Sequence, residues 1–109
     1  MLYDPKWQPK ETKTAEPWRR VLLAAADIIE QRGHATGCFE DGEGRVCMVG
    51  ALQHAAYWSG LIQPYDKRDT YISAQTKIEI YVGEHVPHWN DRHTGPEAIA
   101  ALRAAAASD

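Results

Sequence analysis

The chain has 109 residues, a length that fits one domain large enough to build a real hydrophobic core. Its hydrophobic fraction of 44% and charged fraction of 25% are ordinary for a globular protein. The formal net charge of −3 argues against a nucleic-acid-binding surface, and two cysteines are too few for a disulfide scaffold. The N-terminal sequence lacks an apolar core of signal-peptide length, which favours a cytoplasmic protein with reduced thiols.

The N-terminal segment, residues 1–13, contains two prolines, alternating charge and no hydrophobic periodicity. Such a segment is typical of an extended arm, and we expect it to precede one helical domain of residues 14–109. Leu2, Tyr3 and Trp7 are the side chains able to anchor this arm. Packing of the arm on its own domain is favoured over packing on a partner.

A segment without charged residues, residues 46–65, is expected at the centre of the fold. Its apolar residues recur at spacings of three and four, which predicts a helix over residues 46–59. Gly60 suits the end of this helix, and Pro64 opposes its continuation. Polar residues interrupt the apolar run, so we expect a core helix and not a membrane span.

Three further helices are expected, over residues 14–32, over residues 69–82, and from the Thr94–Glu97 region to residue 107. Thr14 can cap the first, and Gly33 ends it. Gly83 ends the helix before the last loop, and Thr94 with Glu97 forms a capping box. The predicted fold is therefore a compact all-α domain of four helices with an N-terminal arm.

Two segments between these helices are predicted to be irregular. Residues 34–45 contain three glycines that mark turns, and residues 38–47 are expected to form one short β-hairpin. Phe39, the only phenylalanine, is expected to cover an edge of the core. Residues 84–93 are expected to form an irregular loop rich in aromatic residues and histidine.

Cys47 is the candidate reactive residue. It stands near the start of the central helix and follows Arg45, so the helix dipole and a nearby cation would favour its thiolate. A cysteine nucleophile also needs a base and an orienting group, for which His85, His88 and Asp91 are candidates. The order of these residues resembles papain-like peptidases, but those enzymes place the histidine on a sheet, which is not expected here. A small, inert core cysteine is the favoured alternative.

Histidines and cysteines also raise the possibility of a metal site. The two groups of potential ligands are His34, Cys38 and Cys47, and His85, His88 and His93. None of their spacings matches the paired elements of a zinc module, so no metal and no cofactor are predicted. DNA binding is not expected either, because the predicted central helix has no cations and the helix predicted over residues 69–82 has only Lys77.

Several segments resemble a known family. The chain combines Leu22-Leu23-x-Ala25-Ala26-x-Ile28-Ile29, Gly44-Arg45-Val46-Cys47-x-x-Gly50-Ala51-Leu52, and Trp89-Asn90-Asp91 followed by Thr94. This pattern resembles a family of small proteins from actinobacteria and their phages that is catalogued as a domain of unknown function. The resemblance covers residues 20–107 and implies a small helical cytoplasmic protein from such a source. It implies no activity and no catalytic residues.

The sequence favours a non-catalytic protein–protein interaction module, which could bind a host factor for a phage or associate with itself. Its expected contact residues are Tyr3, Trp7, His88 and Trp89, because exposed aromatic side chains on irregular segments are typical of protein contacts. A protein partner or a second copy is therefore expected, with no nucleic acid and no membrane. The alternatives are a cysteine enzyme that uses Cys47 and a small metal-stabilised helical module.

Overall fold

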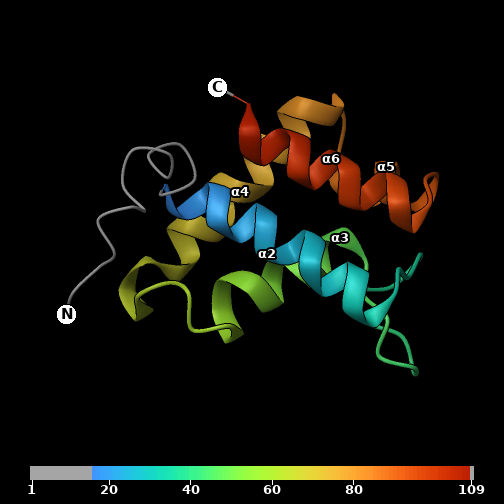
Figure 1. Cartoon of the computed structure of the whole chain (residues 1–109), viewed down its shortest axis with the longest axis horizontal. Helices are drawn as coiled ribbons and strands as arrows, with labels where there is room; N and C mark the ends of the chain where they lie inside the picture. The colour runs from blue at the N-terminus through green and yellow to red at the C-terminus, as the bar shows by residue number, and fades with distance from the viewer. Residues whose placement is uncertain (1–15, 109) are drawn as a thin grey trace, which may run out of the picture.

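The computed structural model describes residues 16–108, over which the chain is helical, as predicted (Figure 1). The α-helices are α2 (Pro17–Arg32), α3 (Met48–Gln53), α4 (Lys67–Val82), α5 (Val86–Asp91) and α6 (Gly95–Ala107). A π-helical turn, His54–Trp58, continues α3, and a 3₁₀ turn, Pro64–Asp66, leads into α4. Strand pairing within this range is limited to two isolated bridges. None of the described helices is long and apolar enough to span a bilayer.

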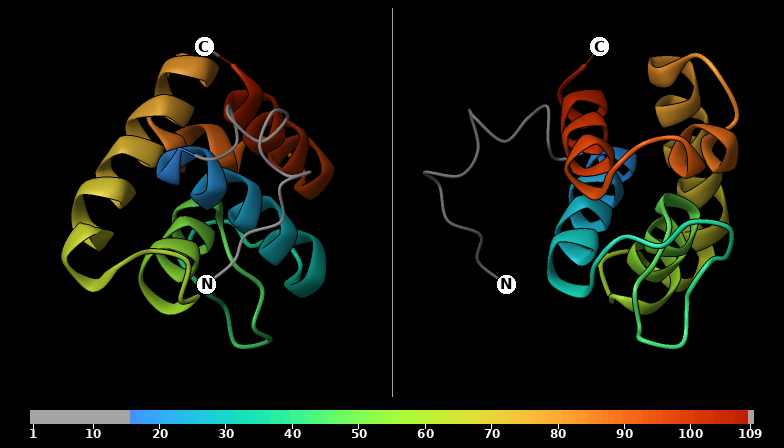
Figure 2. Two further views of the ribbon diagram at one scale, coloured as in Figure 1. Left: turned by 60° about the vertical axis from the view of Figure 1, so that its left-hand side comes forward. Right: turned by 90° about the vertical axis from the view of Figure 1, so that its right-hand side faces the viewer.

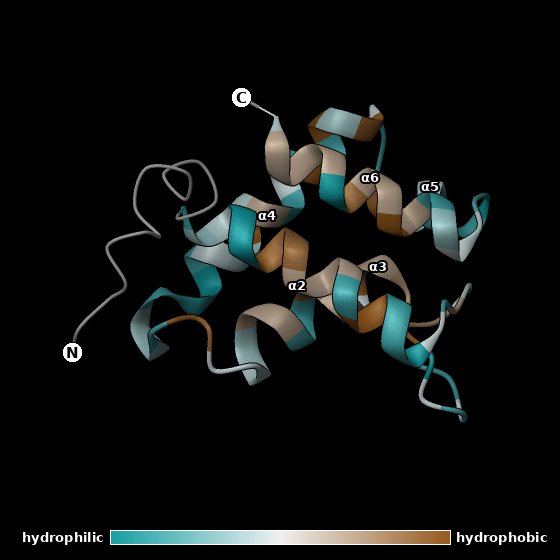
Figure 3. Cartoon of the chain, viewed as in Figure 1, coloured by the Kyte–Doolittle hydropathy of each residue, from teal (hydrophilic) through white to brown (hydrophobic). Residues whose placement is uncertain are grey.

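Helices α2 and α6 lie along each other on one side of the molecule, and the other helices lie on the opposite side (Figure 2). Helix α2 also contacts α3, the π-helical turn and α4, so it is the central element of the packing. Its apolar residues meet those of α6 where the two helices face each other (Figure 3). The alanines of both helices allow this close approach.

The core is made of aliphatic side chains to which each of the five described α-helices contributes. Leu22, Leu52, Ile78 and Leu102 are each fully buried, and each comes from a different helix. Burying an aliphatic side chain of this size contributes about 1.5–3 kcal/mol to stability. The apolar sides of these helices thus face one shared core.

The central helix is shorter at its start than predicted. Val46 and Cys47 are extended, because their N–H groups donate to the carbonyl groups of Gly33 and Phe39, both at 3.1 Å. Cys47 is therefore the N-cap of α3, and the α-helical hydrogen bonding gives way to π-helical bonding from His54. The prediction was correct in placing this segment in the core, where its residues from Val46 to Leu52 are all buried.

The loop before α3 differs from the prediction in two respects. Only Glu40 and Val46 form an antiparallel bridge, so the turn is present but its arms are not strands. Phe39 was predicted to cover the core, but its side chain is 56% exposed and it is the Phe39 carbonyl that faces α3. The turn is held instead by Asp41, whose carboxylate accepts from the N–H groups of Glu43 and Arg45, both at 2.9 Å.

Residues 84–93 are not wholly irregular, since they contain α5. Pro87 lies in the first turn of α5, where the fixed φ of proline favours helix and no N–H is required. Helix α4 begins at Lys67, two residues before the predicted start, because the Pro64–Asp66 turn leads directly into it.

The ends of the other helices agree with the sequence. Gly33 and Gly83 follow α2 and α4 with positive φ angles of 97° and 84°. The capping box is confirmed, because the Thr94 side chain accepts from the Glu97 N–H and the Glu97 carboxylate accepts from the Thr94 N–H. Helix α2 begins at Pro17, three residues after the predicted start, and its N-cap is Glu16 and not the predicted Thr14. The predicted arm lies outside the described residues.

Candidate functional site

Cys47 lies at the start of α3, as predicted, but its surroundings do not activate it. Its side chain is only 4% exposed, and Sγ accepts a hydrogen bond from the Gly50 N–H at 3.3 Å. Burial raises the pKa of the Cys47 thiol, and this effect exceeds the lowering by the N–H groups of Gly50 and Val49. A nucleophilic cysteine needs the opposite shift.

The predicted partners of Cys47 are only partly brought together. The charge of Asp91 raises the pKa of Cys47 further, so Asp91 is near the thiol but does not activate it. His85 lies 3.3 Å from a carboxylate oxygen of Glu79, and its ring centroid is 6.3 Å from that of His88. Within residues 16–108, no hydrogen bond joins Cys47 to a histidine, so the geometry gives the cysteine-enzyme hypothesis no support.

Asn90 is fully buried and joins three segments. Its Oδ1 accepts from the Met48 N–H at 3.0 Å and from His34 Nε2 at 2.7 Å, since an amide oxygen can only accept. Its Nδ2 donates to the Ala35 carbonyl at 3.0 Å and to Asp91 Oδ1 at 3.1 Å. Asn90 thus caps the start of α3 and also fixes the loop after α2. These structural contacts account for a buried asparagine at this position without a ligand.

Trp89 and Asp91, on either side of Asn90, also have structural contacts. The Trp89 ring stacks on His93 with centroids 3.6 Å apart and packs against the hydrophobic core. Asp91 accepts from the Gly37 N–H at 3.0 Å, and this bond contributes most to lowering the pKa of its carboxyl. Of the four predicted contact residues, His88 is exposed, Trp89 is half-buried, and Tyr3 and Trp7 lie outside the described residues.

The potential metal ligands do not converge. Over residues 16–108, no three side chains of histidine, cysteine, aspartate or glutamate are grouped as a metal ion would require. His34 is occupied by Asn90, and Cys38 and Cys47 are both free thiols, one exposed and one buried.

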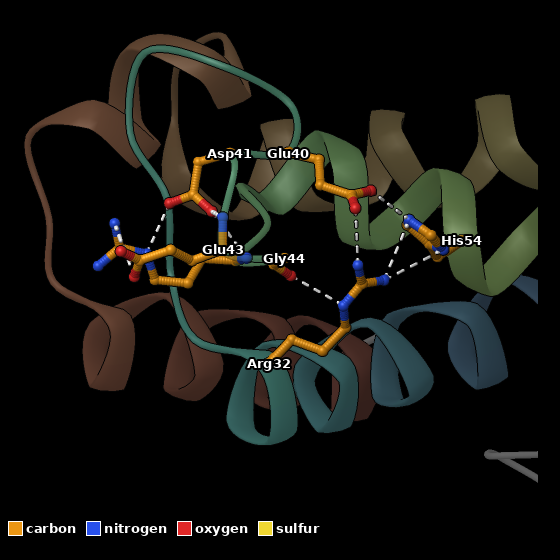
Figure 4. A network of polar contacts seen from close by, with 7 residues as sticks. Arg32, Glu40, Asp41, Glu43, Gly44 and His54 are labelled. Carbon is orange, nitrogen blue, oxygen red and sulfur yellow. Dashed lines mark hydrogen bonds and ion pairs between the residues drawn. The ribbon is translucent and has the colours of Figure 1, made fainter.

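A polar network that the sequence did not predict joins Arg32, Glu40 and His54 (Figure 4). Arg32 Nη2 donates to Glu40 Oε2 at 2.8 Å, and Arg32 Nε donates to the Gly44 carbonyl at 2.8 Å. His54 Nε2 lies 3.1 Å from Glu40 Oε1 and 3.2 Å from Arg32 Nη1. The hydrogen bond with His54, and then the charge of Arg32, lower the pKa of Glu40.

This network connects the end of α2, the loop and the π-helical turn. The ring of Trp58 meets that of His54 edge-on at 4.8 Å, and Trp58 is otherwise 66% exposed. Because Glu40 balances the charge of Arg32, the network resembles a tether for the loop more than an anion site. No spacing in the sequence marks these residues as neighbours, since they come from three separate elements.

A groove of about 800 Å³ lies between the end of α2 and the start of α6. It is lined by Ile29, Glu30, Gly33, His34, Gly95, Pro96, Ile99, Ala100 and Arg103. Arg103 at its rim is held by Asp27 and Glu30, each at 3.0 Å. The groove is open and mainly apolar, and no activated group lies in it.

The outward side of α4 carries large apolar side chains in contact with solvent. Ile72 is 46% exposed and Ile80 is 71% exposed, and Tyr65, in the turn before α4, is 82% exposed. The inward side of α4 is separately occupied, because Ala74 and Ile78 are fully buried in the core. We call the side formed by Tyr65, Ile72, Thr76 and Ile80 the outer face of α4.

Comparison with known proteins supports the resemblance of the sequence to a family of unknown function. Residues 13–108 match a family of unknown function, DUF6197. The chain belongs to this family. The match includes every described helix of this DUF6197 member and leaves out residues 1–12, most of the predicted arm. Neither the curated proteins nor the solved structures contain a significant match to the chain.

Proposed function

We propose that this DUF6197 member is a non-catalytic protein–protein interaction module, and that the outer face of α4 is its contact surface. The exposed apolar side chains of that face carry the proposal. Helices on the surface of a monomer normally present polar residues outward, whereas α4 presents Ile72 and Ile80 outward and Ile78 inward. An apolar patch without an internal partner is typical of a protein contact.

The chemistry near the other candidate residues is consistent with a binding role. The buried Cys47 thiol and the fully bonded Asn90 support the loop before α3 and offer no reactive group. The proposed location is the cytoplasm, which would be the host cytoplasm if a phage encodes the protein. The partner is a protein, either a host factor or a second copy, and Tyr3 and Trp7 of the predicted arm remain proposed contact residues.

Affinity capture with the full chain tests the proposal. Wild type, Ile80→Glu and Ala100→Glu would each be used as bait, because Ala100 is exposed on α6, away from the outer face of α4. We expect wild type and Ala100→Glu to retain the same protein, which Ile80→Glu fails to retain. Retention of the same proteins by all three baits would contradict the assignment of this surface.

A further inference from the structure

We infer that the partner of the outer face of α4 is the same face of a second copy of this chain, packed in antiparallel orientation. This inference rests on the proposed function and identifies the partner. The two copies would be related by a two-fold axis that passes near Ile72. Each Tyr65 would then enter a hollow beside Ile80 of the other copy.

The hollow and the side chain that fits it lie at opposite ends of one face. Tyr65, at the start, is the most exposed of the large apolar side chains in residues 16–108. At the other end a shallow hollow of about 450 Å³ is lined by Thr76, Glu79, Ile80, Gly83, Glu84 and His85. A projection at one end and a hollow at the other fit a reversed copy of the same surface.

The spacing along the helix has the required symmetry. Ile80 lies eight residues after Ile72, or roughly 12 Å along an α-helix. Tyr65 lies seven residues before Ile72, also roughly 12 Å away through the 3₁₀ turn and the first turns of α4. A two-fold contact pairs residue i with j and j with i, so Tyr65 and Ile80 must lie at equal distances from the axis. They do, and Ile72 would meet its own counterpart.

The charges favour the antiparallel arrangement over the parallel one. Arg68 is exposed near Tyr65, whereas the hollow contains the carboxylates of Glu79 and Glu84, of which Glu84 is already ion-paired with Arg92. Antiparallel packing brings Arg68 toward these carboxylates, and parallel packing would place like charges and parallel helix dipoles together. Asp66 and Asp69 also lie at the Tyr65 end and offset the attraction of Arg68 to the hollow, so the charges favour this orientation only weakly and the apolar side chains provide the stabilisation.

The expected contact is small. Stable interfaces bury about 800 Å² on each partner, which is more than the outward face of one 16-residue helix normally provides. We therefore expect reversible association in the micromolar range. The protein would be mainly monomeric when dilute and dimeric when concentrated.

Cysteine cross-linking of the full chain tests the symmetry. Exposed Cys38 is first replaced by serine, and Ile72→Cys, Ile80→Cys and Ala100→Cys are then compared under oxidised glutathione. Two thiols lose two protons and two electrons, which reduce one glutathione disulfide to two glutathione thiols. We expect Ile72→Cys to form linked dimers about tenfold faster than the other two, because only residue 72 meets itself. A mixture of Tyr65→Cys and Ile80→Cys chains should link to each other.

Equal rates for Ile72→Cys and Ala100→Cys would overturn the second-copy inference. If affinity capture still depended on Ile80 in that case, the proposed interaction function would stand with a different protein as partner. If neither the cross-links nor the capture depended on the outer face of α4, both proposals would fail. Faster linking through Ile80→Cys alone would overturn the antiparallel register about Ile72.

Discussion

Asn90 is the residue on which the loop before α3 most directly depends. Replacing it with leucine keeps the branching and the number of side-chain heavy atoms but leaves the Met48 N–H and the Ala35 carbonyl without their partner. Unsatisfied buried polar groups cost about 1–3 kcal/mol each, so we expect Asn90→Leu to lower the free energy of unfolding by about 2–4 kcal/mol. Urea denaturation measures this change.

The matched control is His88→Ala, two residues away and exposed. It should change the free energy of unfolding by less than about 0.5 kcal/mol, as surface substitutions usually do. A loss for Asn90→Leu as small as that of the control would contradict the role assigned to Asn90.

The lowered pKa of Glu40 makes the stability of the fold depend on pH. Its pKa is lower in the folded protein than in the unfolded chain, so the charged carboxylate favours folding at neutral pH. This contribution is present above the unfolded pKa and is lost as the pH falls through the lower folded pKa. Stability measured from pH 6 to pH 3 should therefore fall less steeply for Glu40→Gln than for wild type. Parallel curves for the two proteins would contradict the tether described for Arg32, Glu40 and His54.

The contacts among Arg32, Glu40 and His54 could not be predicted from the sequence. For Cys47, the sequence predicted its position but not its pKa. The sequence placed Cys47 correctly at a helix start, where N–H groups favour a thiolate. What decides its pKa is burial by neighbours distant in the chain, and burial is a property of the folded packing. The contact between Arg32 and His54, 22 positions apart, likewise has no local signal.

At the scale of elements, Gly50 lets α3 approach the loop. A Cβ atom at this position would lie 2.3 Å from the Phe39 carbonyl oxygen. Because that oxygen also accepts from the Cys47 N–H, it cannot move freely. We expect Gly50→Ala to destabilise the fold by about 1–3 kcal/mol, despite the better helix propensity of alanine.

Thermal unfolding of Gly50→Ala beside Gly42→Ala measures this effect. Gly42 has open space where its Cβ would lie and no positive φ, so its substitution should leave the melting temperature nearly unchanged. If Gly50→Ala melted at or above the wild-type temperature, the close approach of α3 and the loop would not be a constraint.

Helices with long apolar stripes or specific end signals could be predicted from the sequence. Helix α6 followed from its capping box, and the ends of α2 and α4 followed from Gly33 and Gly83. Helix α5 was missed because six residues are too few to establish a period. The exposure of Phe39 was missed because hydrophobicity alone does not show which part of a turn faces the core.

At the scale of the whole molecule, the two sides of α4 have different roles. The inward side packs into the core, and the outer face is the proposed contact surface. The stripe of α4 that contains Ala74 and Ile78 packs into the core. Ile72 and Ile80 fall outside that stripe, and this was a usable signal for a second apolar face. Its arrangement with Tyr65 and the hollow required the structure, because the 3₁₀ turn sets the position of Tyr65.

Sedimentation velocity over a concentration series is the most direct test of the contact surface on α4. We expect the weight-average sedimentation coefficient of wild type to rise with concentration toward that of a dimer. Ile80→Glu should remain monomeric at every concentration, because it places a carboxylate beside Glu79 and Glu84 in the hollow. Ala100→Glu should behave as wild type does. A wild-type protein that stayed monomeric throughout, or a dimer unaffected by Ile80→Glu, would contradict self-association through this face.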